Sequence, residues 1–314
     1  MKKVSIVIGL YNSAKTIEAV LEEIDKTFRE SPDLQYEVIL VDDKSPDNVY
    51  EIVKQCAARD NRIKVIHLAK NSGQTSATME GYRFVTGDYV VAMDDDLQMP
   101  AKEILRMINH LEEGDYDVVF AKYLDQKESP FRLFGSRVNN KMTQIMLGKP
   151  KNIRVNSFFV MRRFIAEGIT KYASNYPYTY GIIFALTDNV ANIEVEHRPR
   201  AYGTSNYTFL KLISLWMNGF LNFSVKPLRV AIVLGTLITL ASFVFASILI
   251  ISRLLNPTQY IGWTSIMVAI IFFSGVLLLG IGIVGEYVGR LFISSSGLPR
   301  ATIRETINID NIEE

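Results

Sequence analysis

Two long stretches without a single charged residue constrain the fold of this chain more than any other feature. They cover 230–252 and 260–285 in a chain of 314 residues. Each is longer than the ~20 apolar residues that an α-helix needs to cross a bilayer core. The alternative is a pair of helices buried in a large soluble core, which would require both to be apolar on every face. The sequence therefore predicts two transmembrane helices.

The charges around these stretches predict which side of the membrane the rest of the chain occupies. The outer flanks carry Lys226, Arg229, Arg290, Arg300 and Arg304. The loop between the two stretches carries one basic residue, Arg253. Because basic residues favour the cytosolic side, the large amino-terminal part and the tail are expected in the cytosol, at the inner (cytoplasmic) membrane. The single cysteine, Cys56, permits no intramolecular disulfide and suits a reducing compartment.

The amino-terminal part reads as alternating strands and helices. Runs rich in β-branched residues predict strands at 4–10, 37–42, 63–68, 88–93 and 117–123. Amphipathic stretches between them predict helices that follow a cap at Asn12 or Ser13 and then cover 46–58, 75–85 and 102–111. This alternation predicts an α/β fold with a mostly parallel sheet and helices on both faces. The segment 124–200 is less regular, and the sequence assigns it no elements in detail.

Acidic residues follow two of the predicted strands at the point where each strand ends. They are Asp42 and Asp43 after the second strand, and Asp94, Asp95 and Asp96 after the fourth. Ligands bind at the carboxyl edge of such sheets, and clustered carboxylates repel one another there. A hard divalent cation with oxygen ligands, Mg²⁺ or Mn²⁺, would relieve the repulsion. An exposed acidic turn that caps a helix is the simpler alternative.

Other ligand classes find less support in the sequence. There is no GxxxxGK[ST] loop, and no GxGxxG follows the first strand, so neither an ATPase phosphate loop nor a dinucleotide site is predicted. The glycines of 73–81 are spaced for helix packing. The formal net charge of +1 argues against general nucleic-acid binding, which needs a basic excess.

The order of the motifs resembles glycosyltransferase family 2, with its Rossmann-like GT-A nucleotide-sugar fold. The matching motifs are SIVIGLYN at 5–12, VDDKSPD at 41–47, NSGQTSATMEG at 71–81 and DDDLQMP at 94–100. Two later segments, HRPRAYGTSNYTF at 197–209 and KPLR at 226–229, are similar to the polyprenyl-phosphate branch of that family. That branch includes dolichol-phosphate mannose synthases and the undecaprenyl-phosphate glucosyl- and aminoarabinosyltransferases.

The resemblance implies a reaction. A sugar passes with inversion from a UDP- or GDP-linked donor to a polyprenyl phosphate, undecaprenyl phosphate if the source is bacterial, with Mg²⁺ or Mn²⁺ as cofactor. The product would serve cell-envelope glycan synthesis or lipid modification. The acceptor phosphate, with a second pKa near ~6, is largely dianionic at neutral pH and needs no general base. Assemblies are common in the family, which makes a homo-oligomer an expectation.

The resemblance also assigns roles to residues. For the nucleotide sugar it implies Tyr11, Ser13, Asp42, Asp43, Asp94, Asp95 and Lys122. For the metal it implies Asp94, Asp96 and Gln98. For phosphate and the acceptor it implies Arg200, Ser205 and Asn206, and Arg132 and Arg137 are candidates along the lipid approach. Asp94, Asp96 and Arg200 are the catalytic candidates. Asn206 stands where relatives usually carry lysine, and Asn156 and Ser157 stand where relatives often carry an aspartate.

These expectations divide the chain into four parts. They are a GT-A catalytic domain at 1–206, an amphipathic helix in the membrane interface at 207–228, a transmembrane hairpin at 229–286 and a cytosolic tail at 287–314. An ordinary helix packed on the domain is the alternative for the second part. The alternative functions are a processive polysaccharide synthase, whose Q-x-x-R-W segment this chain lacks, and a catalytically inactive membrane scaffold.

Overall fold

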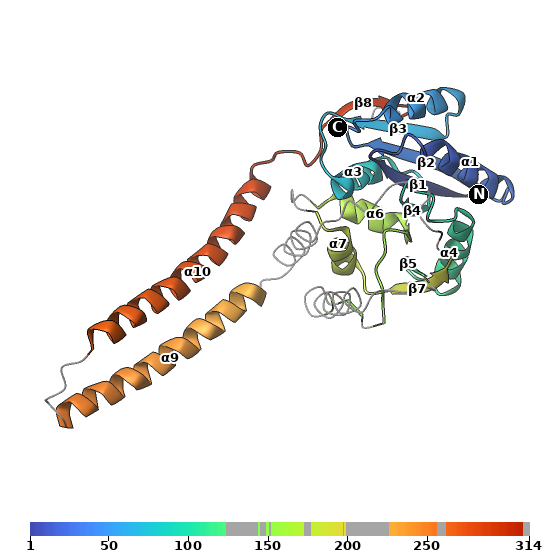
Figure 1. Ribbon diagram of the computed structural model, residues 1–314. Coiled ribbons are helices and arrows are strands. Elements are labelled where there is room, and N and C mark those ends of the chain that lie inside the picture. The colour runs from blue at the N-terminus through green and yellow to red at the C-terminus, as the bar shows by residue number, and fades with distance from the viewer. Residues whose placement is uncertain are drawn as a thin grey trace. The chain divides into compact units, whose positions relative to one another are not determined.

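The computed structural model forms two compact units, each described separately (Figure 1). The first unit comprises Met1–Gly219 together with Leu298–Glu314, and the second comprises Phe220–Gly297. The residues that the structure describes are 1–123, 144, 149–150, 152–172, 177–196, 198, 226–255 and 262–309. The predicted amphipathic helix at 207–228 lies almost wholly outside these residues.

A single mixed sheet forms the centre of the first unit. Within the described residues it has eight strands in the order β7-β5-β6-β4-β1-β2-β3-β8. The strands are β1 Lys2–Leu10, β2 Leu34–Asp42, β3 Ile63–Leu68, β4 Tyr89–Met93, β5 Val118–Tyr123, β6 Phe159–Arg162, β7 Val190–Val195 and β8 Ile303–Ile307. Strands β1 to β4 pair in parallel, as do β5 and β7, whereas β6 and β8 run antiparallel to their neighbours. The predicted α/β class is confirmed.

Helices cover both faces of this sheet (Figure 1). They are α1 Ile17–Arg29, α2 Val49–Arg59, α3 Gln74–Gly81, the short 3-10 turn η1 Tyr82–Phe84, α4 Lys102–Glu113, α6 Arg163–Thr170 and α7 Thr179–Leu186. Alternate residues of a strand point to opposite faces, so Ile6 joins the core under α1, α2 and α4, while Val7 faces α3. A Cβ on Gly81 would lie 2.6 Å from Val7 Cγ1, which confirms a packing role for this glycine.

Two local features differ from the sequence expectations. Neither Asn12 nor Ser13 is the cap residue of α1, which is Thr16; instead the Ser13 carbonyl accepts the N–H groups of Thr16 and Ile17, both at 3.1 Å. The C-terminal tail also contains a strand that the sequence did not predict. This strand, β8, pairs with β3 at one edge of the sheet. A run of only five residues with alternating polarity, such as 303–307, is too weak a sequence pattern to predict a strand.

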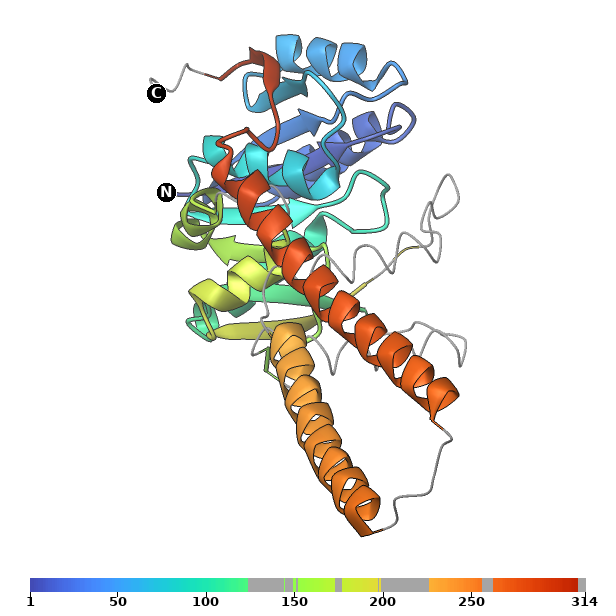
Figure 2. The ribbon, with the colours of Figure 1, turned by 90° about the vertical axis from the view of Figure 1, so that its left-hand side faces the viewer.

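The second unit is a pair of long helices. They are α9 Lys226–Leu255 and α10 Trp263–Ser295, which lie side by side (Figures 1 and 2). Among the described residues, one segment is long and apolar enough to cross a membrane, Phe272–Ser295 with a mean hydropathy of 1.8. Ala231–Phe245 in α9 is apolar but shorter. The candidate segment overlaps the second expected span, 260–285, and both spans stay predictions.

Candidate active site at the carboxyl edge of the sheet

The candidate site lies where four parallel strands end together. Strands β1, β2, β3 and β4 all point their carboxyl ends to the same edge. The chain moves from β1 through β2 to β3 and then crosses to β4 on the other side of β1. Such a reversal opens a crevice outside the carboxyl ends of the two strands, which is where doubly wound sheets bind ligands.

The backbone at this edge adopts conformations that most residues avoid. Asn12, Lys44 and Leu97 follow β1, β2 and β4, and their φ angles are 61°, 53° and 62°. Left-handed backbone at residues other than glycine costs about 1–3 kcal/mol and clusters at functional sites. Leu97 is the least suited of the three, because it lacks the short polar side chain that makes this conformation tolerable in asparagine. Leu97 lies within the acidic turn 94–98, between Asp96 and Gln98.

Two neutral donors orient the Asp94 carboxylate. Gln74 Nε2 at the start of α3 donates to Asp94 Oδ1 at 2.8 Å, and Ser157 Oγ donates to Oδ2 at 2.7 Å. The loop that carries Ser157 is itself fixed by Asn192 of β7, whose amide both donates to and accepts from the Arg154 backbone at 2.7 Å. Sequence reasoning noted Ser157 only as a departure from relatives and did not single out Gln74 or Asn192.

The next residues of the turn contact the loop after β1 and each other. The Tyr11 N–H lies 3.4 Å from Asp95 Oδ2, and the Gln98 N–H donates to Asp96 Oδ1 at 3.2 Å. Burial raises the pKa of the Asp95 carboxyl, while the Ser13 hydroxyl and the Tyr11 N–H act in the opposite direction. Tyr11 is 47% exposed, whereas Ser13 is buried. The structure therefore brings the loops after β1 and β4 together at this edge.

Gln98 links this turn to the segment that leads to Arg200. The Arg198 N–H donates to the Gln98 carbonyl at 3.0 Å, and Gln98 Nε2 donates to the Arg198 carbonyl at 3.3 Å. Arg198 also pairs with Glu23 of α1 at 3.0 Å. The predicted phosphate and acceptor residues lie outside the described part of the chain; they are Arg200, Ser205, Asn206, Arg132 and Arg137.

The two acids at the end of β2 are buried and hold neighbouring loops. Asp43 accepts the N–H groups of Ser72 at 2.6 Å and Gly73 at 2.8 Å. Asp42 accepts the Ser45 N–H at 3.1 Å and contacts His67 Nδ1 at 2.6 Å. Burial raises the pKa of both carboxyls, and these hydrogen bonds lower it in part. In this structure, both acids shape the edge through the loops that they hold.

Lys122 forms an ion pair within the sheet. It is in β5, where its ammonium pairs at 2.7 Å with Glu194, its register partner in β7. Both side chains are partly exposed, so water screens this pair. Its predicted contact with the nucleotide sugar stays a prediction.

The donor set of the acidic turn fits a hard divalent cation. Asp94 and Asp96 offer carboxylate oxygens, and Gln98 lies within the same turn. In the described part of the chain, no group of three or more His, Cys, Asp or Glu side chains forms a metal cage. Mg²⁺ commonly uses only one or two protein carboxylates and completes its shell with water and substrate phosphates. The turn suits that arrangement better than a site built from protein ligands alone.

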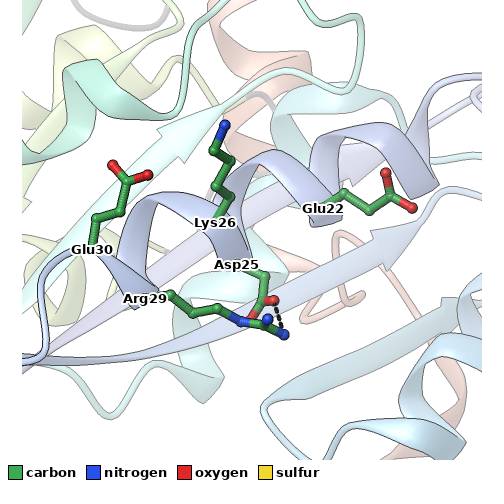
Figure 3. Close-up of a pocket in the computed structure, with 5 residues that line it drawn as sticks. All are labelled: Glu22, Asp25, Lys26, Arg29 and Glu30. Atoms are coloured by element: carbon green, nitrogen blue, oxygen red, sulfur yellow. Dashed lines mark ion pairs between the residues drawn. The ribbon is translucent and has the colours of Figure 1, made fainter.

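A surface hollow lies elsewhere, on the outer side of α1 (Figure 3). Its lining residues are Glu22, Asp25, Lys26, Arg29 and Glu30. Arg29 pairs with Asp25 at 2.6 Å, as the dashed line in the figure marks. The lining is charged throughout and shares no residue with the acidic turn, so this hollow is not a candidate for the active site.

Comparisons with known proteins agree with this geometry. The family described as glycosyl transferase family 2 matches residues 5–170. The undecaprenyl-phosphate 4-deoxy-4-formamido-L-arabinose transferase of Proteus mirabilis (strain HI4320) is 32% identical over 312 residues, covering 98% of this chain and 95% of that protein. The protein of the same name from Serratia proteamaculans (strain 568) is 33% identical, covering 98% and 94%.

A solved structure shares the fold. Glucosyl-3-phosphoglycerate synthase from Mycobacterium tuberculosis, crystallised with Mn²⁺, uridine diphosphate and phosphoglyceric acid, aligns with a TM-score of 0.50 and 17% identity, covering 69% of this chain and 75% of that one. At this identity the likeness extends to the fold alone. With a family match over more than half of its length and relatives that align almost end to end, this chain belongs to glycosyl transferase family 2 and is a glycosyltransferase.

Proposed function

We propose that this protein transfers a sugar from a nucleoside-diphosphate sugar to undecaprenyl phosphate, with inversion at the anomeric carbon. The observation that carries the proposal is the oriented acidic turn at the β1/β4 crevice, in a chain that aligns over 98% of its length with undecaprenyl-phosphate 4-deoxy-4-formamido-L-arabinose transferases. The donor's sugar is not assigned, because the residues that would distinguish sugars have no signature in the sequence.

On the donor side, Asp94 and Asp96, with Gln98, would hold Mg²⁺ or Mn²⁺. When bound, such an ion neutralises the charge that develops on the departing diphosphate. Gln74 and Ser157 keep the Asp94 carboxylate in one orientation for this task. The remaining donor-site residues in this proposal are Tyr11, Ser13, Asp42, Asp43, Asp95 and Lys122. Support comes from the position of the first five at the same sheet edge as the turn.

On the acceptor side, the lipid phosphate attacks the anomeric carbon. As a dianion it carries the nucleophilic electron pair already, so no side chain has to remove a proton. This is consistent with neutral Asn156 and Ser157 beside Asp94. Basic groups are needed to bring two anions together, and Arg200 is the proposed one, with Ser205, Asn206, Arg132 and Arg137 near the lipid. The hydrogen bond from Gln98 to the Arg198 carbonyl supports this role, because it holds the chain just before Arg200 at the acidic turn.

The membrane segments fit a lipid acceptor. The tail of a polyprenyl phosphate stays in the bilayer, so its phosphate reaches only the interface. An anchor such as Phe272–Ser295 keeps the enzyme at that interface. The proposal places the catalytic unit on the cytosolic side, in agreement with the basic residues that flank the apolar stretches.

The test uses the full-length chain in lipid nanodiscs with undecaprenyl phosphate and a panel of UDP- and GDP-sugars. Nucleoside diphosphate release and the lipid-linked sugar, by mass spectrometry, are measured with Mg²⁺, with Mn²⁺ and with chelator. One donor should give a singly glycosylated lipid in a metal-dependent manner, and Asp96→Asn should abolish it. Asp33→Asn, the same change in the exposed loop before β2, is the matched control.

Four results would reject the proposal. Full turnover in the presence of chelator would show that the reaction does not depend on a divalent cation at this site. A product with the retained anomer would exclude a single displacement. A polymer formed from the nucleotide sugar without lipid phosphate would favour the processive synthase instead, and no turnover with any donor would favour the inactive scaffold.

A further inference from the structure

Three polar side chains form a row across three neighbouring strands at one end of the sheet. In the strand register Asp42 of β2 is opposite His67 of β3, and His67 is opposite Glu305 of β8. Register partners point to the same face of a sheet. The Asp42 carboxylate lies 2.6 Å from His67 Nδ1, and the charge of Glu305 faces the same imidazole. The strand that follows α10 thus contributes one end of the row (Figure 1).

A tyrosine covers the centre of this row. The Tyr50 ring of α2 stacks on the His67 imidazole, with centroids 4.1 Å apart and an interplanar angle of 27°. Burial raises the pKa of the Tyr50 hydroxyl, and the neighbouring Glu305 adds to that effect. The imidazole is therefore confined from three sides, by Asp42, by Glu305 and by an aromatic face. A histidine held in this way has one preferred orientation and presents its Nδ1 to Asp42.

The row continues into the loops of the candidate site. Asp42 Oδ1 accepts the Ser45 N–H at 3.1 Å, and Ser45 Oγ accepts the Asn12 N–H at 2.7 Å. Asn12 has a left-handed backbone, and its neighbour Tyr11 places its N–H 3.4 Å from Asp95 of the acidic turn. One chain of contacts thus joins β8 to the turn that would hold the donor diphosphate.

A second brace ties the same two loops together. Asp47 Oδ2 accepts the Ala14 N–H at 2.9 Å, so the loops after β1 and β2 are joined at two points. The Asp47 brace has no link to β8, whereas the Ser45 brace depends on Asp42 and through it on His67. Loss of the histidine should therefore loosen one of two braces and leave the fold intact.

We propose that His67 is a positioning residue for the donor site, through which the C-terminal strand β8 fixes the loops that contact the nucleotide. The imidazole does not touch substrate in this assignment. It holds the fully buried Asp42 carboxylate, which holds Ser45, which holds the left-handed Asn12 beside Tyr11. The link to the nucleotide rests on the proposed function, whereas the link from His67 to the loops stands on the contacts alone.

The test compares substitutions of His67 in the full-length chain. His67→Leu removes the donor to Asp42, and His67→Asn restores one, because an asparagine Nδ2 occupies nearly the place of the imidazole Nδ1. We expect His67→Leu to raise the KM for the nucleotide sugar about tenfold, at the lower end of losses for supporting residues around a site. The KM for undecaprenyl phosphate should stay within twofold, and His67→Asn should recover most of the loss.

Two further measurements make the inference independent of turnover. Hydrogen exchange of the backbone N–H groups of 11–16 and 43–48 should quicken in His67→Leu while α4 stays protected. Binding of UDP and of GDP, each with Mn²⁺, should weaken by the same factor as the KM rises. Glu305→Gln should give a smaller rise of about two- to threefold, because its side chain is exposed and water screens its charge. Arg304→Gln is the control, because Arg304 is adjacent to Glu305 in the chain but is not paired with a residue of β3.

The outcomes separate this inference from the proposed function. Unchanged exchange in both loops of His67→Leu would overturn the inference even if the enzyme is fully active. So would an equal rise of both KM values with no recovery in His67→Asn, since that pattern describes a general loss of stability. A wild-type protein that binds neither nucleotide and transfers no sugar would overturn the proposed function, and the exchange experiment would still decide the role of His67.

Discussion

Buried carboxylates occur at both ends of the central strands, and their pKa values are shifted in opposite directions. Glu37, in the amino-terminal half of β2, is 2% exposed and lies 2.8 Å from Lys3 Nζ and 2.9 Å from Lys64 Nζ. Its Oε1 also accepts the hydroxyl of Ser5 and the N–H of Thr86. Despite its burial, these donors lower the pKa of the Glu37 carboxyl from 4.5 to about 2.

At the carboxyl edge Asp43 and Asp95 accept hydrogen bonds from neutral backbone groups, while Asp42 contacts the His67 imidazole. Asp43 accepts two backbone N–H groups, and the charge of Asp42 adds to burial in raising its pKa. Asp95 has the backbone N–H of Tyr11 at 3.4 Å, and burial raises the pKa of its carboxyl as well. At the amino end, the charge of Glu37 is therefore compensated by lysines of the protein itself. The carboxyl edge keeps negative charge in a desolvated place, which is typical of a site that awaits a cationic ligand.

The sharpest test of the comparison is to neutralise one acid in the turn. Asp94→Asn replaces one acceptor oxygen by a donor that faces Gln74 or Ser157, both of which donate already. Transfer of sugar should fall at least about 100-fold, the size of effect seen when one preorganised electrostatic contact is lost. The melting temperature should stay close to that of the wild type. A loss of less than tenfold would show that Asp94 is not part of the reaction, and Asp33→Asn again serves as control.

The opposite result is expected at the amino end. Glu37→Gln leaves Lys3 and Lys64 without their common partner, and breaking a buried ion pair from one side costs about 3 kcal/mol or more. Thermal unfolding in detergent should show the destabilisation, while the kcat of the folded fraction should not change. Equal stability of the variant and the wild type would mean that water already screens these charges.

The pH dependence of the same variant has a definite sign. Because the pKa of Glu37 is about 2 in the folded state and near 4.5 unfolded, its contribution is fully present above pH 4.5. It is lost as the pH falls from 4.5 to 2, when the unfolded chain binds a proton first. The stability difference between the wild type and Glu37→Gln should therefore be constant at neutral pH and shrink in that window. A difference that grows on acidification would contradict the assignment.

Neutralising Asp95 should have a smaller effect on stability and with the other sign. A carboxyl whose pKa is raised by burial weakens the folded state once it is ionised, so Asp95→Asn should stabilise the protein at neutral pH. Gains of this kind are commonly about 0.5–2 kcal/mol and come with a loss of activity. The measurement is the melting temperature at pH 7 together with the donor KM. Destabilisation would show that the ionised Asp95 is compensated after all.

The sequence predicted the arrangement of the edge better than the orientation of the groups in it. Strands β1 to β4 and the place of Asp94–Asp96 follow from hydrophobic runs and from the rule that parallel strands share a carboxyl edge. The contacts of Gln74, Ser157 and His67 were missed because they join residues 20, 63 and 25 positions apart. No local pattern reports such pairs. Strand β8 was missed for a related reason, since an edge strand is stabilised by its partner rather than by its own pattern.

The smallest effect on stability is expected for the hollow on α1, which lies outside both groups of buried acids. Arg29 pairs with Asp25 one turn earlier, but its side chain is mostly exposed and Asp25 also pairs with Arg62 at 2.9 Å. Exposed pairs of this spacing contribute about 0.3–0.5 kcal/mol. Arg29→Ala should therefore shift the melting temperature by about a degree and leave both KM values unchanged. If sugar transfer fell more than twofold instead, this charged hollow would bind a substrate or the membrane. Charged groups that bind a ligand would then occur on α1 as well as at the carboxyl edge of the sheet.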